Sequence, residues 1–207
     1  MTIDALTALA RKRRLVLGSR SPRRVQLLAE LGIEFRQEIS ELDEAQRSGE
    51  DPFRYAVRLA EDKALDVSHR CEADEIVIGG DTVVVLEGVI LGKPSDRGEA
   101  VATLLKLSGK RHTVCTALAL VNGTGILCSG AENTEVYFNR VTEEQIARYV
   151  DTGEPMDKAG AYGIQGMGAF LVDRIEGNLD NVVGLPRALL NSLSREAYRL
   201  VLHGTDC

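Results

Sequence analysis

Tryptophan is absent from this chain, and only 4% of its 207 residues are aromatic. The chain carries a net charge of −6 and has a pI near 5.2. A nucleic-acid groove usually combines basic patches with aromatic side chains on which bases stack. The composition therefore argues against a nucleic-acid partner and favours a small ligand that brings its own charge-neutralising metal.

Cysteine is scarce and has no motif spacing. Cys71, Cys115, Cys128 and Cys207 form no CxxC pair and lie far from any group of histidines. This spacing supports neither a zinc site nor a redox dithiol. We interpret the four as reduced thiols and expect a cytoplasmic protein.

No segment indicates export or membrane insertion. The basic residues 11–14 follow a short amphipathic helix rather than a signal peptide, and the strand after them is too short to span a membrane. We therefore expect no membrane partner. With 44% hydrophobic and 27% charged positions, the chain fits one medium domain or two small lobes that share a cleft, with a substantial core.

Strands and helices alternate along the whole chain, without a linker or a repeat. Residue patterns predict strands at 15–18, 33–39, 75–79, 82–86, 89–91, 112–121 and 125–138. They predict helices at 25–31 (opened by Ser21 and Pro22), from 52 through 64, and at 99–107, 142–150 and 185–202. The sequence therefore predicts an α/β fold with a mixed β-sheet flanked by helices.

The stretch Glu154–Gly166 mixes glycines with acids, a lysine, a tyrosine and a glutamine. Gly160, Gly163 and Gly166 allow a positive φ or a close approach to another group, and side chains such as Lys158 and Gln165 can donate to a bound molecule. We expect a small anionic ligand here. The alternative is a pair of turns between a helix and a strand.

The stretch Gly18–Arg24 lies between a predicted strand and a predicted helix. Backbone N–H groups at a helix start attract anions, and the hydroxyls of Ser19 and Ser21 with the guanidinium groups of Arg23 and Arg24 strengthen that attraction. The stretch matches neither the P-loop nor the dinucleotide-binding glycine pattern. It is a candidate phosphate cradle, and the alternative is a capped helix with solvated arginines.

Asp81 follows two glycines at the end of a predicted apolar strand, where a carboxylate would be exposed at a sheet edge. Such an acid can hold a metal or take a proton from water. Glu44 offers a second carboxylate, and two acids together would suit Mg²⁺ or Mn²⁺. Lys63 and Lys93 would add positive charge near phosphates, although a helix lysine such as Lys63 is by default a surface residue, and acids in turns are usually just solvated.

Five motifs together resemble the Maf family of nucleoside triphosphate pyrophosphatases. In chain order they are Ser19–Arg24, Gly79–Thr82, Gly92–Pro94, Glu154–Gly166 and Asn181–Pro186. The resemblance runs from about residue 14 to the last helix, so residues 1–13 are expected to be an N-terminal extension and 14–207 a single domain. It implies an elongated mixed α/β fold with a deep cleft, like that of the inosine triphosphate pyrophosphatases, and a cytoplasmic homodimer.

The resemblance also implies residue roles. Asp81 matches the catalytic acid that activates water, and Glu44 matches the metal-proximal glutamate. The positions that match the family's phosphate contacts are Ser19, Arg24, Lys63 and Lys93. Arg23, Thr82 and Gln165 fit the branch that acts on dTTP and UTP, whereas the branch that acts on 7-methyl-GTP has tryptophan, glutamine and glutamate at these positions.

The sequence departs from the family pattern at Arg20, where a small residue is common, and at Gly80, where alanine is common. Arg20 would alter triphosphate affinity, and Gly80 would loosen the loop holding Asp81. The expected function is hydrolysis of dTTP and UTP to the monophosphate and pyrophosphate with Mg²⁺ or Mn²⁺. The alternatives are a pyrophosphatase for 7-methyl-GTP or another modified nucleotide, and a regulator of septum formation that binds a nucleotide without turning it over.

Overall fold

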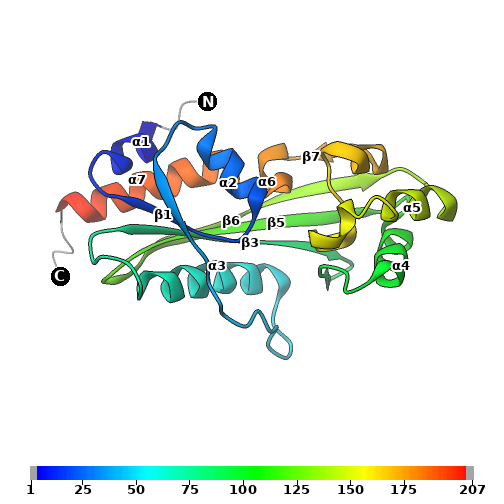
Figure 1. The fold of residues 1–207 in the computed structure, drawn as a ribbon, viewed down its shortest axis with the longest axis horizontal. Helices are drawn as coiled ribbons and strands as arrows, with labels where there is room; N and C mark the ends of the chain where they lie inside the picture. Colours follow the sequence, from blue (N-terminus) through cyan, green and yellow to red (C-terminus); the bar gives the residue numbers. More distant parts are fainter. Residues whose placement is uncertain (1–3, 204–207) are drawn as a thin grey trace. The chain divides into compact units, whose positions relative to one another are not determined.

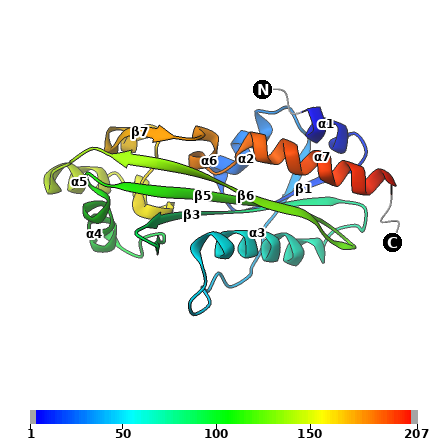
Figure 2. The same cartoon turned by 180° about the vertical axis from the view of Figure 1, so that it is seen from behind.

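The computed structural model describes residues 4–203, and its strands form one mixed β-sheet (Figures 1 and 2). The strands are β1 (Leu15–Gly18), β2 (Phe35–Glu38), β3 (Ile76–Leu86), β4 (Val89–Leu91), β5 (Arg111–Asn122), β6 (Gly125–Phe138) and β7 (Val172–Glu176). Their order is β2-β1-β3-β5-β6-β7, with β4 paired to β3. Because β1 is parallel to β2 and β3 while β4 and β7 are antiparallel to their partners, the predicted mixed α/β sheet is confirmed.

Seven α-helices and three short 3-10 helices accompany the sheet in residues 4–203. The α-helices are α1 (Asp4–Ala10), α2 (Pro22–Ala29), α3 (Pro52–Ser68), α4 (Arg97–Leu107), α5 (Glu143–Val150), α6 (Leu179–Val183) and α7 (Arg187–His203). The 3-10 helices are η1 (Glu154–Asp157), η2 (Ala159–Ala161) and η3 (Gly166–Leu171). The 3-10 helices, α6 and β7 do not follow from the sequence patterns, because segments this short carry too few apolar positions to show a period.

The chain forms two compact units. Within the described residues, the first comprises residues 4–81, 116–132 and 184–203, and the second comprises residues 82–115 and 133–183. The chain crosses between them within β3, β5 and β6, and again between α6 and α7. A single domain over residues 14–207, the elongated shape and the deep cleft stay predictions.

In the first unit, helices pack on both faces of the strands. Figure 1 shows α3 on one face and α1 with α7 on the other. Leu6 and Leu9 of α1 are fully buried, and α1 packs against α7, where the Ala5 N–H donates to Asn191 Oδ1 at 3.1 Å. Within the predicted N-terminal extension, α1 therefore contributes Leu6 and Leu9 to the core of this unit.

The second unit has its own hydrophobic core under α4, α5 and the 3-10 helices. Its largest members include Leu104, Leu107, Phe138, Ile146 and Tyr162. α5 begins with a capping box in which the side chains of Thr142 and Gln145 each accept from the other residue's backbone N–H. This cap satisfies N–H groups that an open helix start would leave without partners.

The predicted break of the strand at Gly80 and Asp81 is wrong. β3 runs without interruption from Ile76 to Leu86, so Asp81 lies in the interior of a strand and Gly80 is not in a loop. Gly79 instead allows a helix to pack closely on the strand. A Cβ on Gly79 would meet the carbonyl oxygen of Ala60 and lie 2.7 Å from the Cβ of Ala64, so glycine lets α3 lie directly on the strand.

Cys71, Cys115 and Cys128 form no disulfide in the described part of the chain, in line with the reduced thiols expected from the sequence, and Cys207 lies outside the described residues. No helix within residues 4–203 is long and apolar enough to cross a bilayer.

Candidate active site

Asp81 is held by an ion pair inside the first unit. Asp81 is 8% exposed, and its Oδ1 accepts a hydrogen bond from Lys63 Nζ at 2.6 Å. The same ammonium lies 2.9 Å from Glu44 Oε1. The structure therefore brings together both carboxylates that the sequence predicted as metal ligands, around one cation.

Two features of the sequence place Asp81 there. β1 pairs with β3 only as far as Gly79, so Asp81 lies two residues beyond the last paired position on that side. Successive strand residues point to opposite faces, so Asp81 shares the face of Gly79, on which α3 packs. An acid within a strand is held more rigidly than one on a loop.

Lys63 is not the solvated helix lysine that its local sequence suggests. Its side chain is only 12% exposed, because the close approach of α3 at Gly79 carries it over the strand. α3 itself is firmly started by Asp51, whose side chain accepts from the N–H groups of Phe53 and Arg54, with Pro52 at the first helical position. The ammonium of Lys63 thus offsets the charge of both acids.

The loop that carries Glu44 is tied to α3 by residues that sequence reasoning missed. The hydroxyl of Tyr55 donates to the carbonyl oxygen of Glu44 at 2.7 Å. The guanidinium of Arg58 binds both oxygens of Glu50, at 2.6 and 2.7 Å, and the carbonyl oxygen of Ala45 at 3.2 Å. Burial raises the pKa of Tyr55 to about 12, and the negative charges of Asp81 and Glu44 act in the same direction.

Arg24 lies beneath this site rather than in solvent. It is 5% exposed, and it donates to Ser19 Oγ at 2.7 Å, to the carbonyl oxygen of Gly80 at 3.1 Å and to that of Gly184 at 2.8 Å. Burial lowers the pKa of Arg24, and the charge of Asp81 opposes that shift. Arg24 therefore connects the residue after β1, the strand β3 and the chain before α7, next to the catalytic candidate.

The start of α2 matches the predicted strand, loop and capped helix. Ser21 caps the helix by accepting from the Arg24 N–H at 3.4 Å, and Pro22 occupies the first helical position. The Ser21 N–H donates to Ser19 Oγ at 3.2 Å. Arg23 is half-buried and Arg20 is exposed. Phosphate binding by these residues stays a prediction.

Thr82, Lys93, Lys158 and Gln165 belong to the second unit. Thr82 follows Asp81 in β3, while Lys93 and Gln165 are exposed. Lys158 Nζ donates to the carbonyl oxygen of Glu154 at 2.5 Å and to Asp157 Oδ1 at 2.6 Å. Gly160 has a φ of +68°, and a Cβ there would lie 2.9 Å from Val84, so this glycine permits core packing.

Asp81 and Glu44 suit a hard divalent cation bound together with its substrate. No cluster of three or more His, Cys, Asp or Glu side chains suited to a metal occurs in residues 4–203. Mg²⁺ commonly binds to one or two carboxylates, substrate phosphates and water, and does not need a full protein cage. The carboxylates of Asp81 and Glu44, now paired with the Lys63 ammonium, fit that pattern.

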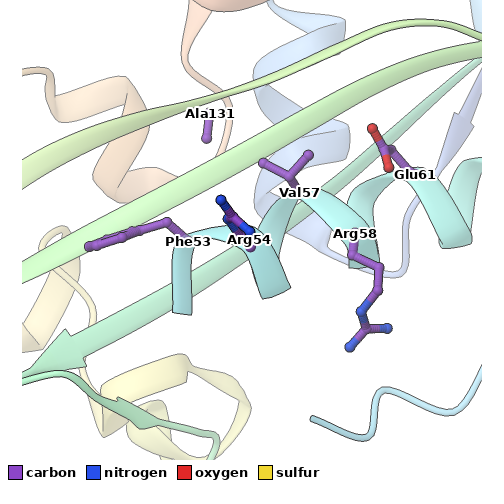
Figure 3. Close-up of a pocket in the computed structure, with 6 residues that line it drawn as sticks. All are labelled: Phe53, Arg54, Val57, Arg58, Glu61 and Ala131. Carbon is purple, nitrogen blue, oxygen red and sulfur yellow. The ribbon is translucent and has the colours of Figure 1, made fainter. Parts of the chain in front are cut away.

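A separate shallow pocket of about 340 Å³ lies on the first unit (Figure 3). Its lining residues are Phe53, Arg54, Val57, Arg58, Glu61 and Ala131. In Figure 3, Val57 points toward Ala131, whereas Arg58 points away from it. None of the predicted site residues lines this pocket.

Comparison with known proteins gives the following findings. A family model described as Maf-like protein matches residues 14–197. A dTTP/UTP pyrophosphatase from Geobacter metallireducens is 50% identical over 175 residues, which are 84% of this chain and 90% of that protein. A dTTP/UTP pyrophosphatase from Thermoanaerobacter sp. is 45% identical over 185 residues, which are 88% and 96% of the two chains.

Among solved structures, a nucleoside-triphosphatase, or dITP/XTP pyrophosphatase, from Mycobacterium abscessus is 15% identical, with a TM-score of 0.46 over 93% of this chain and 98% of its own. The family model covers most of the chain, and the two sequence relatives match it over nearly their whole length. The chain belongs to the Maf family.

Proposed function

We propose that this protein is a nucleoside triphosphate pyrophosphatase that hydrolyses dTTP and UTP to the monophosphate and pyrophosphate. The observation that carries the proposal is the 45–50% identity to full-length relatives named for this activity. The buried ion pair between Asp81 and Lys63 supports it. A fixed carboxylate can take a proton from the attacking water, and a neighbouring cation can stabilise the charge on the phosphate.

Asp81 is the proposed catalytic residue. Its Oδ1 is held by Lys63, which fixes the orientation of the carboxylate so that the group can orient or deprotonate the attacking water. Glu44 and Asp81 would hold Mg²⁺ or Mn²⁺. When bound, such an ion neutralises phosphate charge and stabilises the charge that develops during transfer.

The remaining site residues are proposed to bind the nucleotide. Ser19, Ser21, Arg24, Lys63, Lys93 and Lys158 are the proposed triphosphate contacts. Arg23, Thr82 and Gln165 are the proposed determinants of the base, because an amide such as Gln165 can pair with the O4 and N3–H edge that uracil and thymine share. A cytoplasmic location and a homodimer remain predictions from the family resemblance.

The test is a nucleotide panel with product identification. The purified protein is incubated with UTP, dTTP, CTP, GTP and 7-methyl-GTP, with Mg²⁺ or Mn²⁺ and with excess chelator, and pyrophosphate and orthophosphate are measured separately. We expect pyrophosphate, the highest kcat/KM for UTP and dTTP, and no turnover in chelator.

Each competing function predicts a different outcome of that panel. Release of orthophosphate would mean cleavage between the outer phosphates and would contradict a pyrophosphatase. A preference for 7-methyl-GTP would assign the protein to the branch of the family that acts on 7-methyl-GTP. Tight nucleotide binding without turnover would favour the regulator of septum formation. Full activity in chelator, with metal content shown to be negligible, would exclude the metal from the mechanism.

A further inference from the structure

We propose that Glu154 and Tyr149 are positioning residues that hold the loop carrying Gln165 and so set base selection. The inference rests on the proposed function, since it takes Gln165 as the residue that reads the base. All the residues that carry it belong to the second unit.

The carboxylate of Glu154 gathers three donors. Oε1 accepts from the hydroxyl of Tyr149 at 2.9 Å and from the Gly168 N–H at 3.2 Å, and Oε2 accepts from the Met167 N–H at 2.9 Å. The hydroxyl of Tyr149 in turn accepts from the Gly163 N–H at 3.0 Å. The backbone on both sides of Gln165 is therefore bound to one pair of side chains.

The glycines of this stretch make that arrangement sterically accessible. A Cβ on Gly163 would lie 3.0 Å from Glu154 Oε1, and one on Gly166 would lie 3.0 Å from Oε2, with a φ of +79° at Gly166. A Cβ on Gly168 would lie 2.6 Å from the hydroxyl of Tyr149. These glycines admit side chains of the protein itself, so Glu154 and Tyr149 shape the loop.

Tyr149 is itself held in place by its surroundings. Tyr149 is 3% exposed on α5, which its capping box secures, and its ring packs edge-to-face with Phe170 at 6.0 Å between centroids. Hydrogen bonds from backbone N–H groups to a carboxylate are charge-assisted, and therefore stronger than neutral ones. Gln165 itself is exposed between the bound residues, so its backbone is fixed while its side chain can meet a base.

A fixed backbone matters because it sets the distance between the Gln165 amide and the ribose of the nucleotide. The amide NH₂ can donate to O4 and its oxygen can accept from N3–H of uracil, and the same two groups could pair with O6 and N1–H of guanine. In a purine that edge lies farther from the ribose, so an amide held at one place can pair with uracil and not with guanine, whereas a mobile one would reach both. Loss of Glu154 or Tyr149 should thus reduce selection of UTP over GTP more than it reduces kcat with UTP.

The experiment compares kcat and KM for UTP and GTP in wild type, Glu154→Gln, Tyr149→Phe and Gln165→Ala. Glu144→Gln is the matched control, because Glu144 is an exposed residue of α5 that pairs only with Arg148 in the described part of the chain. We expect Glu154→Gln and Tyr149→Phe each to lower the ratio of kcat/KM for UTP to that for GTP by roughly tenfold, mainly through the KM for UTP. The control should keep the wild-type ratio.

A double variant, Glu154→Gln with Gln165→Ala, separates positioning from general damage. If Glu154 acts through Gln165, the double variant should select no worse than Gln165→Ala alone. An unchanged base ratio in folded Glu154→Gln or Tyr149→Phe would overturn the inference and leave the pyrophosphatase standing. Should Gln165→Ala keep the wild-type ratio, the inference fails with the role of Gln165. A wild type that releases no pyrophosphate from UTP would instead refute the proposed function.

Discussion

The ion pair between Lys63 and Asp81 is the residue-scale feature on which activity should depend. We predict that Asp81→Asn lowers kcat by at least ~10²-fold and leaves the fold intact. The amide keeps the shape of the side chain but loses the proton-accepting oxygen and the negative charge. The Lys63 ammonium keeps the carboxylate of Glu44 as a partner at 2.9 Å, so the variant does not leave a buried cation without a counter-charge.

Pyrophosphate release from UTP measures that change, and circular dichroism with thermal unfolding checks the fold. Asp173→Asn is a suitable control, because Asp173 is an exposed acid that pairs with Arg174. Near wild-type turnover in purified Asp81→Asn would show that another group activates water.

Residue identities in this site were accessible from the sequence, but their surroundings were not. The position of Asp81 after two glycines suggested a strand end, since glycine often marks a turn. In the structure those glycines let α3 and Arg24 approach β3 from its two faces; a Cβ on Gly80 would lie 3.1 Å from the guanidinium of Arg24. A contact between segments distant in sequence leaves no local pattern, so the burial of Lys63 and Arg24 and their contacts at β3 could not be predicted from the sequence.

At the scale of elements, Gly79 controls how α3 lies on β3. We predict that Gly79→Ala destabilises the protein by about 1–3 kcal/mol, because the new methyl group would overlap Ala60 and Ala64 and force the helix outward. Lys63 would move with the helix, so kcat should fall as well. The urea midpoint and the rate with UTP are the two measurements.

Gly98→Ala is the control for that substitution. Gly98 lies in the first turn of α4, where a Cβ would have only the side chain of Asp96 nearby, at 3.3 Å, and alanine is the better helix former. We expect its midpoint to stay level or rise. A Gly79→Ala protein as stable and active as wild type would mean that α3 can shift without moving Lys63.

The long elements and the short strands β1 and β4 were predictable, whereas β7, α6 and the 3-10 helices were not. Ser21 with Pro22, and Pro52 with the apolar period after it, mark the starts of α2 and α3 within a few residues. The strand β7 was not predicted, because Val172–Glu176 has only two apolar residues. It forms a strand through its pairing with β6. The 3-10 helices around Gln165 depend on Glu154, whose bonds join residues up to 14 positions apart.

At the scale of the whole molecule, the alternation of strands and helices predicts the class of fold but not the order of strands. β1 pairs with β3 across about 60 residues of intervening chain, a choice that no local pattern encodes. The division of the chain within β3 was equally hidden, because the residues around Asp81 and Thr82 are one continuous strand.

Overall stability should respond to pH through a buried histidine in the second unit. His112 is 2% exposed, its Nε2 shares a hydrogen bond of 2.9 Å with the hydroxyl of Tyr162, and the rings of Phe138 and Tyr162 pack against it edge-on. Its Nδ1 has no partner among the described residues. Burial lowers the pKa of His112 from 6.5 to about 4.

The sign of the effect follows from that shift. Between pH 6.5 and 4 the unfolded chain binds a proton at His112 that the folded chain does not, so the free energy of unfolding falls as the pH falls. The contribution above pH 7 is nil, because the ring is neutral in both states. From pH 7 to pH 5 the loss should be on the order of 2 kcal/mol, at about 1.4 kcal/mol per pKa unit. Glu75, whose pKa is lowered to about 2 by hydrogen bonds from Arg36, titrates mainly below this range.

We predict that His112→Leu flattens this pH dependence, whatever it does to stability at pH 7, because the substitution removes the proton-binding group. Tyr162→Phe is the matched control, since it removes the hydroxyl partner yet keeps the buried imidazole, and it should retain the slope. Urea unfolding at half-unit steps from pH 7 to pH 5 gives the free energy of unfolding for the three proteins. Equal slopes in wild type and His112→Leu would mean that His112 takes up its proton in the folded state as readily as in the unfolded chain, so that the packing of Phe138 and Tyr162 does not keep the ring neutral.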